Sequence, residues 1–581
     1  MKLSDEQHKV VFSPLKPLSV IACAGSGKTT TAVHRLSHVR HSLNNERGYI
    51  ALLSFSNVAV NTFKRDFLRH TSNQTNKHVY SDRVVIETLD SFIVGNVIRP
   101  HGSRVMGCSG VPFLLSGGEL FLKNRNFNFE IETQTGRKTI GSDKVVELTC
   151  RVVDSSVECF LNKNKVAEGR DLILTLGKTG GYTHEFGGYW ACKILKEQKS
   201  LAKAIAKRYP HIIVDEAQDI GSMHAYFLSM LIKGGTKLSL IGDPNQAIYE
   251  FAGADGTFLN THNNKPSTLK CPLSLNRRSI KDIVDAASLV SGFQNQHIRS
   301  KENNDFGLFY CTYKEKNYTE VIDSFLSRLK DLSINKNKSA ILVRGSELKK
   351  TLLGSNGKSG QGKTNIFAQA AIKRDLYGHP FEAFKLVLRC IANLIEDAPK
   401  EFFSDVLSAA KDKREYSESK KVIWQFVRSE SAGLPSAKLH AKKEWHPKLK
   451  ENLAKVLKKI CELHGFNNVS KLGNKLASTN LPDSALLPSE YAKSDDDGRR
   501  LIRIDTVHQL KGETLDAVMY IANNDQVVKM AEGTSTELGR IGYVALTRAR
   551  DFFVLAIPHS KEPKLSKLLT PMGFKKLTSS D

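Results

Sequence analysis

The stretch LSVIACAGSGKTTTAVHRLSHVR, residues Leu18 to Arg40, joins an apolar run, a glycine-rich turn and a longer segment that opens with a lysine. LSVIA predicts a buried strand, AGSG predicts a tight turn, and the residues after Lys28 predict a helix. A strand that leads through glycines into a helix directs backbone N–H groups and the helix N-terminus at a phosphate. This stretch therefore predicts an α/β fold with a nucleotide site at Lys28.

A second stretch competes for the same role. GKSGQGKT, residues Gly357 to Thr364, fits the pattern G-x-x-x-x-G-K-[ST] at every position, whereas ACAGSGKT, Ala22 to Thr29, lacks its first glycine. The polar, glycine-bearing KKTLLGSN precedes Lys363, and the surrounding composition is typical of an exposed linker between domains. Because a phosphate-binding loop needs a strand before it and a helix after it, the surroundings favour Lys28 over Lys363.

Runs typical of strands alternate with helical stretches along the chain, which indicates parallel sheets with crossover helices. The first set comprises LSVIA, Tyr49 to Phe55, Val84 to Leu89, His211 to Ala217 and Leu238 to Asp243. The second set comprises Ala340 to Gly345, Leu501 to His508, Ala517 to Ala522 and Phe552 to Pro558. Two α/β domains are expected, and two stretches of different character, roughly residues 100 to 205 and 356 to 499, interrupt the strand-like runs.

Composition sets outer limits on the function. The 581 residues suit several domains, and no apolar run reaches the roughly 18 residues that cross a membrane. The N-terminus resembles neither a signal nor a transit peptide, so a cytoplasmic protein is expected. Nine scattered cysteines without a C-x-x-C pair argue against a disulfide framework or zinc ribbon, and we expect them to be reduced and mostly structural. The net charge of +25 fits either a nucleic-acid partner or a solubilising surface.

Adjacent carboxylates follow the strand run at His211 to Ala217. Asp215 and Glu216 lie at the end of this run, where one carboxylate can hold Mg²⁺ and the other can deprotonate an attacking water. The alternative is that these acidic residues only cap the next helix. Together with Lys28 they predict an ATP-hydrolysing site.

Six motifs, quoted in chain order, give the sequence a family resemblance. They are VIACAGSGKTTT, IIVDEAQD, LIGDPNQAIYEFAGA, SLNRRS, IDTVHQLKGETLD and GYVALTRAR. Their order and spacing resemble those of the UvrD, Rep and PcrA type of superfamily 1 DNA helicase, from Gln7 to Arg550. The resemblance implies two RecA-like P-loop domains, each with a largely helical inserted subdomain. The implied division is 1–99 with 206–262 for the first domain, 100–205 for its insert, 263–355 with 500–581 for the second domain, and 356–499 for its insert.

The resemblance also implies roles at the ATP site, with ATP and Mg²⁺ as cofactors. Glu216 resembles the catalytic base, Gln246 the sensor of the γ-phosphate, and Arg278 and Arg548 the arginines that the second domain extends toward it. Thr29 and Asp215 resemble the metal-binding pair. The residues expected to bind the nucleotide are Gln7, which resembles the glutamine that reads adenine, and Ala22, Cys23, Ala24, Gly25, Ser26, Gly27, Lys28, Thr29, Thr30 and Arg277.

Contacts to single-stranded DNA are implied at three motifs. The residues that resemble the family's strand contacts are Phe55, Asn57, Tyr249, Phe251, Thr506 and His508. Aromatic rings suit this role because bases stack on them regardless of sequence, although an aromatic near a strand end is also commonly core. The IY after Gln246 resembles the branch that moves 3′ to 5′.

Several positions depart from the family pattern. Arg277 stands where an aromatic usually stacks on adenine, so its guanidinium plane would have to stack instead or base selectivity is relaxed. Val58 replaces a customary lysine, and Asp90 replaces a customary histidine. The acid Glu513 lies one residue before the family's usual glutamate, where Thr514 stands. These changes are compatible with hydrolysis and argue mainly against efficient unwinding.

The expected partners are single-stranded or tailed DNA, with no membrane. KLHAKKEWHPKLK in the second insert fits either a contact to duplex phosphates or a solvated helix face. Because the chain ends soon after Arg550, a nuclease is expected on another chain. The length and VIETLDSFIVGNVIRP resemble GajB, the UvrD-like subunit of the Gabija antiphage system, which works beside GajA, an OLD-type endonuclease. Two hypotheses remain: a DNA-translocating helicase, and a DNA-sensing ATPase that controls a bound nuclease.

The choice between the two lysines can be tested directly. Lys28→Ala should reduce DNA-stimulated ATP hydrolysis at least ~100-fold, because the phosphates lose their fixed cation. Lys363→Ala is the matched control and should leave hydrolysis nearly unchanged. Phosphate release measured with both variants decides the question, and the opposite pattern would move the site to Lys363.

Overall fold

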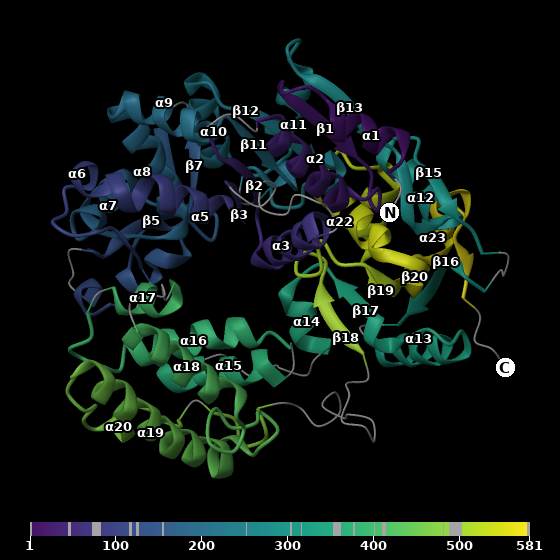
Figure 1. Cartoon of the computed structure of the whole chain (residues 1–581). Helices are drawn as coiled ribbons and strands as arrows, with labels where there is room; N and C mark the ends of the chain where they lie inside the picture. Colours follow the sequence, from purple (N-terminus) through teal and green to yellow (C-terminus); the bar gives the residue numbers. More distant parts are fainter. Residues whose placement is uncertain are drawn as a thin grey trace. The chain divides into compact units, whose positions relative to one another are not determined.

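The computed structural model describes the chain except for residues 1–2, 44–47, 73–82, 116–118, 124–126, 154–155, 251–252, 302–304, 315–316, 353–361, 376–377, 400, 409–413, 480, 487–501 and 578–581. The chain forms two compact units, drawn together in Figure 1. The first unit comprises Met1–His101, Gly188–Lys349 and Ile502–Asp581, and the second comprises Gly102–Gly187 and Lys350–Leu501. Each unit therefore combines segments that are distant in the sequence.

A six-stranded sheet in the first unit has the strand order β13-β1-β12-β11-β2-β3, and all its pairings are parallel. Its strands are β1 (Leu18–Ala22), β2 (Ile50–Ser54), β3 (Val84–Thr88), β11 (His211–Val214), β12 (Lys237–Gly242) and β13 (Leu269–Leu273). The helices in the same part of the chain are α1 (Asp5–Phe12), α2 (Lys28–Ser42), α3 (Asn57–Ser72), α5 (Leu89–Ile93), α9 (Lys199–Arg208), α10 (Ser222–Gly234) and α11 (Thr257–Asn264). Every residue of β2 and of β11 is buried, as expected for central strands covered on both faces.

A second six-stranded sheet in the same unit has the order β18-β17-β19-β20-β16-β21, again parallel throughout. Its strands are β16 (Gly307–Tyr313), β17 (Ser339–Val343), β18 (Arg503–Thr506), β19 (Leu515–Ile521), β20 (Ala549–Pro558) and β21 (Lys575–Lys576). A separate parallel pair is formed by β14 (Leu275–Ile280) and β15 (Gln296–Arg299). The accompanying helices are α12 (Lys281–Ser291), α13 (Thr319–Asp331), α14 (Ser346–Leu352), α21 (Asn524–Glu532), α22 (Glu537–Arg548) and α23 (Glu562–Leu569).

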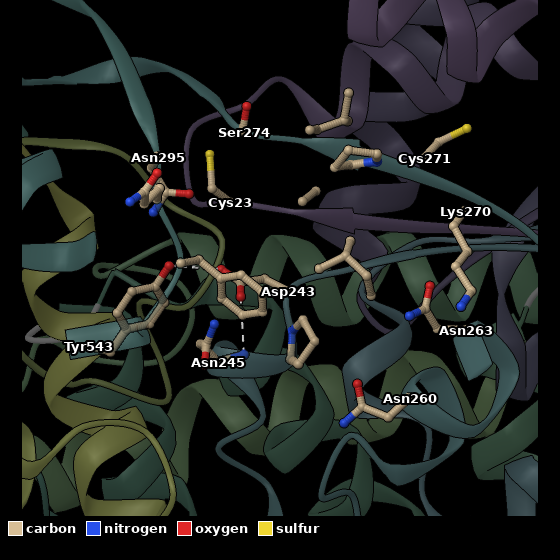
Figure 2. A pocket seen from close by; sticks show the side chains of 17 residues that line it. Cys23, Asp243, Asn245, Asn260, Asn263, Lys270, Cys271, Ser274, Asn295 and Tyr543 are labelled. Carbon is tan, nitrogen blue, oxygen red and sulfur yellow. Dashed lines mark hydrogen bonds between the residues drawn. The ribbon is translucent and has the colours of Figure 1, made fainter. Parts of the chain in front are cut away.

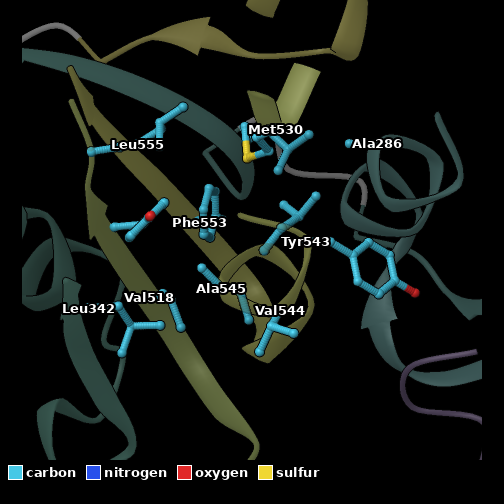
Figure 3. Close-up of a cluster of buried hydrophobic side chains, with 14 of the residues drawn as sticks. Ala286, Leu342, Val518, Met530, Tyr543, Val544, Ala545, Phe553 and Leu555 are labelled. Carbon is cyan, nitrogen blue, oxygen red and sulfur yellow. The ribbon is translucent and has the colours of Figure 1, made fainter. Parts of the chain in front are cut away.

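Helix α22 forms the centre of the second core, which Figure 3 shows. Its Val544 and Ala545 belong to the same buried cluster as Val518 of β19 and Phe553 of β20. Gly542 allows α21 to approach closely, because a Cβ atom there would lie 2.6 Å from the Met530 side chain. Every residue from Gly539 to Arg548 is buried, so the polar residues of α22 in this range are buried as well as the apolar ones.

The strand-like runs predicted from the sequence are all strands, with ends that differ by a few residues. Strand β13 was not predicted. Its sequence LKCPL contains Pro272, and proline has no backbone N–H to donate to a neighbouring strand. Strands therefore accept proline mainly at a sheet edge, and β13 is an edge strand of the first sheet. The parallel arrangement places the ends of β1, β11 and β12 at one edge of that sheet, where loops meet to form a site.

The second unit includes most of the first predicted insert, as Gly102–Gly187, and the range of the second, while 188–205 belongs to the first unit. Residues after Lys350 form helices, namely α15 (Lys363–Asp375), α16 (Pro380–Ala392), α17 (Phe402–Ser408), α18 (Arg414–Arg428), α19 (His446–His464) and α20 (Leu472–Lys475). The first insert is mixed rather than largely helical. Beside α7 (Gly169–Lys178) it contains β4 (Phe113–Leu114), β5 (Phe129–Thr133), β6 (Gly136–Ile140), β7 (Thr149–Val153), β8 (Ser156–Leu161), β9 (Asn164–Lys165) and β10 (Gly181–Tyr182). Strands β5 and β6 pair antiparallel, β8 pairs antiparallel with β7 and β9, and β4 and β10 pair in parallel. Strands this short lack the longer apolar runs that predict buried strands.

The chain divides into two compact units, whereas four domains were predicted. The limits of the four domains therefore stay a prediction. Helices α6 (Arg99–Met106) and α8 (His184–Glu197) each continue from one unit into the other. A continuous helix has no sequence signal for a boundary, so turn residues and composition cannot mark it. Over the ranges that are described, no helix is both long and apolar enough to cross a membrane.

Candidate functional site

The loop between β1 and α2 has the backbone of a phosphate cradle. Gly25 and Gly27 both adopt left-handed conformations, with φ of 73° and 82°. A Cβ atom at Gly25 would lie 2.6 Å from the Arg278 Cβ, so only glycine leaves the turn enough space. Helix α2 begins at Lys28 without a side-chain cap, which leaves its first N–H groups available to an anion.

The two candidate lysines have different surroundings. The positive charge of Lys28 acts on three carboxylates, those of Asp215, Glu216 and Asp243. Lys363 is the first residue of α15 in the second unit, and its Nζ donates to the Asn393 carbonyl at 2.8 Å. Residues 357–361 of its glycine stretch lie outside the described part of the chain, as does the predicted linker. The context required of a phosphate-binding loop therefore surrounds Lys28.

Asp215 and Glu216 follow β11, where Asp215 is buried and Glu216 is half-buried. Glu216 has a left-handed backbone, with φ of 52°, and its Oε2 accepts from Gln218 Nε2 at 2.5 Å. Burial opposes ionisation of Glu216, but Lys28 and Lys511 outweigh it and lower the pKa of that carboxyl. Burial and the neighbouring Glu216 charge instead raise the pKa of Asp215 to about 8. Adjacent carboxylates with opposite shifts are a common arrangement of acid–base and metal sites.

The residues present fit a Mg²⁺ ion bound with a nucleotide. Asp215 Oδ1 is buried and has no hydrogen-bond partner among the described residues. Mg²⁺ in nucleotide sites takes one or two protein oxygens and the remainder from phosphates and water. A buried carboxylate oxygen without a partner is such a ligand, and the Thr29 hydroxyl at the start of α2 is the second candidate.

The loop after β12 connects the site to α22 of the second sheet. Asp243 Oδ2 accepts from Gln246 Nε2 at 2.9 Å and from the Tyr543 hydroxyl at 3.2 Å. Gln246 Oε1 in turn accepts from Arg548 Nη2 at 3.1 Å. The predicted sensor and the predicted arginine are therefore in direct contact, although 302 residues separate them in the sequence.

Both predicted arginines lie at this junction. Arg548 Nη1 donates to the Glu513 carbonyl at 3.1 Å, and Arg278 Nη1 donates to the Thr547 carbonyl at 2.9 Å. Burial, together with the charge of Arg548, lowers the pKa of Arg278 to about 9. The charges of both arginines also act on Glu216. The two guanidinium groups thus lie near the carboxylates of the first sheet.

Lys511 belongs to the site and was not predicted. Its Nζ donates to both carboxylate oxygens of Asp219 at 2.6 Å and to the Gln246 carbonyl at 2.7 Å. It also lies 5.0 Å from the centre of the Tyr249 ring. The motif HQLKGETLD contains this lysine, but nothing local in the sequence indicates which distant carboxylate it meets.

The two residues predicted near the base are held by the loop. Gln7 Nε2 donates to the Ser26 carbonyl at 3.2 Å, while its Oε1 accepts from the Ser4 N–H at 3.0 Å. Arg277 donates its backbone N–H to the Gly25 carbonyl at 2.9 Å, and its Nε is buried without a partner among the described residues. The Gln7 side chain and the Arg277 backbone therefore both stabilise the loop. The Nε of the Arg277 guanidinium remains an unused donor.

The predicted strand contacts form two groups. In one, the Tyr249 hydroxyl donates to the His508 carbonyl at 3.3 Å, and the His508 Nε2 bonds the Ile248 carbonyl at 2.9 Å. Thr506 is buried one residue after Asp505 on β18, and its hydroxyl donates to Gln509 Oε1 at 3.2 Å. Phe251 lies outside the described residues.

The second group lies at the ends of β2 and β3. Phe55 is half-buried and Asn57 is exposed at the start of α3. His224 of α10 lies edge-on to the Phe55 ring, with 6.0 Å between ring centres, and its Nε2 is 2.9 Å from Asp90 Oδ1. His224 was not predicted, because no motif contains it and only the fold brings α10 beside β2.

A pocket of about 370 Å³ lies beside the loop between β1 and α2, which contributes Cys23 to its lining (Figure 2). Cys23, Asp243 and Tyr543 are at one end of it, while Asn260 and Lys270 are among the residues at the other. Burial raises the pKa of Cys23 to about 12, which keeps this thiol protonated near neutral pH. Lys270 is the only cation among the residues that line the pocket. Because a triphosphate would need more positive charge around it, the pocket suits polar neutral groups better.

Comparison with known proteins agrees with this geometry. The family model described as the UvrD/REP helicase N-terminal domain matches residues 3–148 and 123–267. A probable DNA helicase II homolog of Mycoplasma capricolum is 24% identical over 300 residues, which are 49% of this chain and 40% of that protein. The ATP-dependent DNA helicase PcrA of Leuconostoc citreum is 20% identical over 359 residues, 58% of this chain and 45% of that protein. The mitochondrial ATP-dependent DNA helicase HMI1 of Saccharomyces cerevisiae is 25% identical over 311 residues, 50% of this chain and 40% of that protein. The chain thus spans less than half the length of these relatives.

The buried pair of Lys511 and Asp219 should stabilise the junction of the two sheets. Lys511→Met leaves the Asp219 carboxylate buried without its cation, at a cost of about 3 to 5 kcal/mol. Lys529→Met is the control, because it removes only an exposed pair with Glu532 worth at most about 1 kcal/mol.

The pH dependence of this loss has a defined sign. Burial already raises the pKa of Asp219 to about 6 although Lys511 opposes the shift, and loss of the lysine raises it further. A carboxyl with a raised folded pKa destabilises the fold increasingly as pH rises, so the drop in unfolding temperature should be larger at pH 8 than at pH 5. Equal drops at both pH values, or a drop no larger than that of Lys529→Met, would contradict the assignment.

Proposed function

We propose that this chain, a UvrD-like superfamily 1 helicase by its motifs and fold, is a DNA-stimulated ATPase that translocates on single-stranded DNA in the 3′ to 5′ direction. The proposal rests on one observation above the others, the hydrogen bond from Arg548 to Gln246. It connects the helix of the second sheet to the loop of the first, beside the buried carboxylates. An arrangement of this kind makes the relative position of the two sheets depend on what occupies the site between them.

ATP with Mg²⁺ would supply the phosphoanhydride to be cleaved and the charge that neutralises it. In this proposal Lys28 and the N–H groups of the loop hold the phosphates, and Asp215 with Thr29 holds the metal ion. Glu216 has a lowered pKa, so it is ionised near neutral pH and able to accept a proton from water. Gln218 fixes the orientation of this carboxylate through its hydrogen bond at 2.5 Å.

The arginines are proposed to complete the site from the opposite side. Arg548 and Arg278 each donate to backbone carbonyls, which fixes their guanidinium groups before any ligand arrives. Preorganised cations stabilise charge that develops on transferred oxygens without paying a reorganisation cost. The Arg277 guanidinium, with its unused Nε donor, is proposed to cover the base in place of an aromatic ring.

The proposed DNA path follows the two groups of exposed and half-buried rings. Phe55 and His224 supply stacking surfaces at the end of β2, and Asp90 orients the imidazole. Asp90, which stands where the family pattern has a histidine, thus brings an imidazole from α10 to this place. Tyr249 and His508 are proposed to link this path to the ATP site, because Tyr249 contacts Lys511 as well.

A second function retains the same ATP site. In it the chain senses DNA ends and controls a bound OLD-type endonuclease, as in Gabija-like antiviral defence, with little unwinding of its own. The departures at Val58 and Asp90 favour this alternative, because both lie where the family contacts the strand, and Val58 is 76% exposed and uncharged. Both functions require the same ATP hydrolysis. They differ in strand displacement, which the translocase carries out and the regulatory ATPase largely lacks.

Parallel assays of ATP hydrolysis and strand displacement on 3′-tailed, 5′-tailed and blunt duplexes test the proposal. A 3′ to 5′ translocase should separate only the 3′-tailed duplex, and single-stranded DNA should stimulate its hydrolysis. Hydrolysis stimulated by DNA ends without displacement would favour the regulatory function. Hydrolysis that DNA does not change would contradict both.

Arg548→Ala should separate catalysis from binding. We expect hydrolysis to fall at least ~100-fold while ATP affinity falls by much less, because this arginine acts on charge that develops during the reaction. The affinities for ATP and for single-stranded DNA should also depend on each other by one common factor in the unmodified protein, of roughly 5 to 150. The variant should lose this coupling.

Arg550→Ala is the matched control, since Arg550 lies on the same motif but is exposed and pairs with Asp516 at 3.6 Å. Both affinities are measured with a non-hydrolysable analogue at one fixed salt concentration, because phosphate contacts are salt-dependent. If Arg548→Ala behaves like Arg550→Ala, the arginine has no role between the two sheets.

His224→Ala should weaken binding of single-stranded DNA about ten-fold, as expected for one lost stacking contact of ~1 to 3 kcal/mol. Hydrolysis at saturating DNA should remain. His559→Ala removes an imidazole that is also near a carboxylate, that of Glu562, and serves as the control. Fluorescence anisotropy with a labelled oligonucleotide gives the affinities, and an unchanged value for His224→Ala would remove it from the DNA path.

A further inference from the structure

Two cysteines of the first insert face each other across an antiparallel hairpin. Strands β7 and β8 pair so that Cys150 is opposite Cys159, and Arg151 is opposite Glu158. The Sγ atoms of the two cysteines are 2.9 Å apart. This hairpin is in the second unit, outside the site described above.

The register at this point is the one that suits a covalent link. The Cys150 N–H donates to Glu185 Oε2 at 3.2 Å, and the Cys159 carbonyl accepts from the Val166 N–H at 2.8 Å on the other side of β8. The two cysteines therefore exchange no backbone hydrogen bonds with each other. Opposed residues of this kind have Cα atoms about 4.5 Å apart and their side chains closer than in hydrogen-bonded pairs. That separation lies within the range of about 4.4 to 6.8 Å that a disulfide spans.

The packing around the pair admits this link and excludes a larger group. Cys150 and Cys159 are 3% and 0% exposed. A Cβ atom at Gly169, the first residue of α7, would lie only 3.1 Å from the Cys159 Cβ and 3.3 Å from its Sγ. The space beside the sulfurs therefore has no room for a bulky adduct such as a glutathionyl group.

We propose that Cys150 and Cys159 are a site of reversible oxidation, at which a peroxide converts the two thiols into a cross-strand disulfide. One thiol reduces the peroxide O–O bond to give a sulfenic acid and one water, and the second thiol displaces a second water from that sulfur as the S–S bond forms. Both thiol protons leave in the two waters, and the pair has lost two electrons to the peroxide. A dithiol reductant reverses the change.

The buried thiols react only when the hairpin opens locally. Their mutual hydrogen bond and their burial raise the pKa of Cys150, which keeps the thiolate scarce in the closed hairpin. Transient opening of short strands at the edge of a domain is common, and it admits a molecule as small as hydrogen peroxide. Once formed, the link holds β7 to β8 and prevents further opening.

The test counts thiols in the full-length protein. The chain is incubated with hydrogen peroxide, quenched, unfolded in guanidinium, and titrated with a chromogenic thiol reagent. We expect the count to fall by two from nine, to return to nine after a dithiol reductant, and to be accompanied by a mass loss of two hydrogens in a peptide pair containing both cysteines. Cys159→Ala should lose no thiols under the same conditions.

The control is Cys461→Ser, which removes another buried cysteine of the same unit and should still lose two thiols. Cys150→Ala repeats the test from the other side of the pair, so that failure of one variant to fold does not decide the result. Three outcomes would overturn the proposal: a count that stays at nine, a loss that persists in Cys159→Ala and Cys150→Ala, or oxygen addition to these cysteines without a link between them.

Discussion

Three carboxylates gathered at the ends of neighbouring strands are the constraint on which the first unit depends. Asp215 and Asp243 are buried and Glu216 is half-buried at one edge of the sheet, where an isolated negative charge would cost several kcal/mol. Fixed cations make this burial tolerable. Lys28 reaches all three carboxylates from the loop, and Arg548 reaches two of them from the second sheet.

This balance of charge explains why the two sheets belong to one unit. Lys511 and Arg548 come from the second sheet, and each bonds Gln246 of the first. The position of Arg548 is fixed because it ends α22, which is buried from Gly539 onward and packs with Gly542 against Met530. A bound triphosphate and its metal would redistribute the same charges, so the geometry that stabilises the fold is also the geometry that would respond to a nucleotide.

The second unit has a distinctive feature of its own among its described residues. This feature is the hairpin with Cys150 and Cys159, whereas Asp215, Glu216 and Asp243 all belong to the first unit. The proposed DNA path, with Phe55 and His224, lies in the first unit.

The strands and the glycine loop before Lys28 could be predicted from the sequence alone, because these signals are local. LSVIA, the glycines and Lys28 lie within a dozen residues, and the apolar run before Asp215 predicts both the strand and the place where it ends. The distant groups that meet follow instead from the tertiary fold. The partners of Lys511 and the approach of His224 to Phe55 depend on which segments the fold brings together. The pairing of Cys150 with Cys159 depends on strand register, and a shift of one residue would turn these side chains to the opposite face.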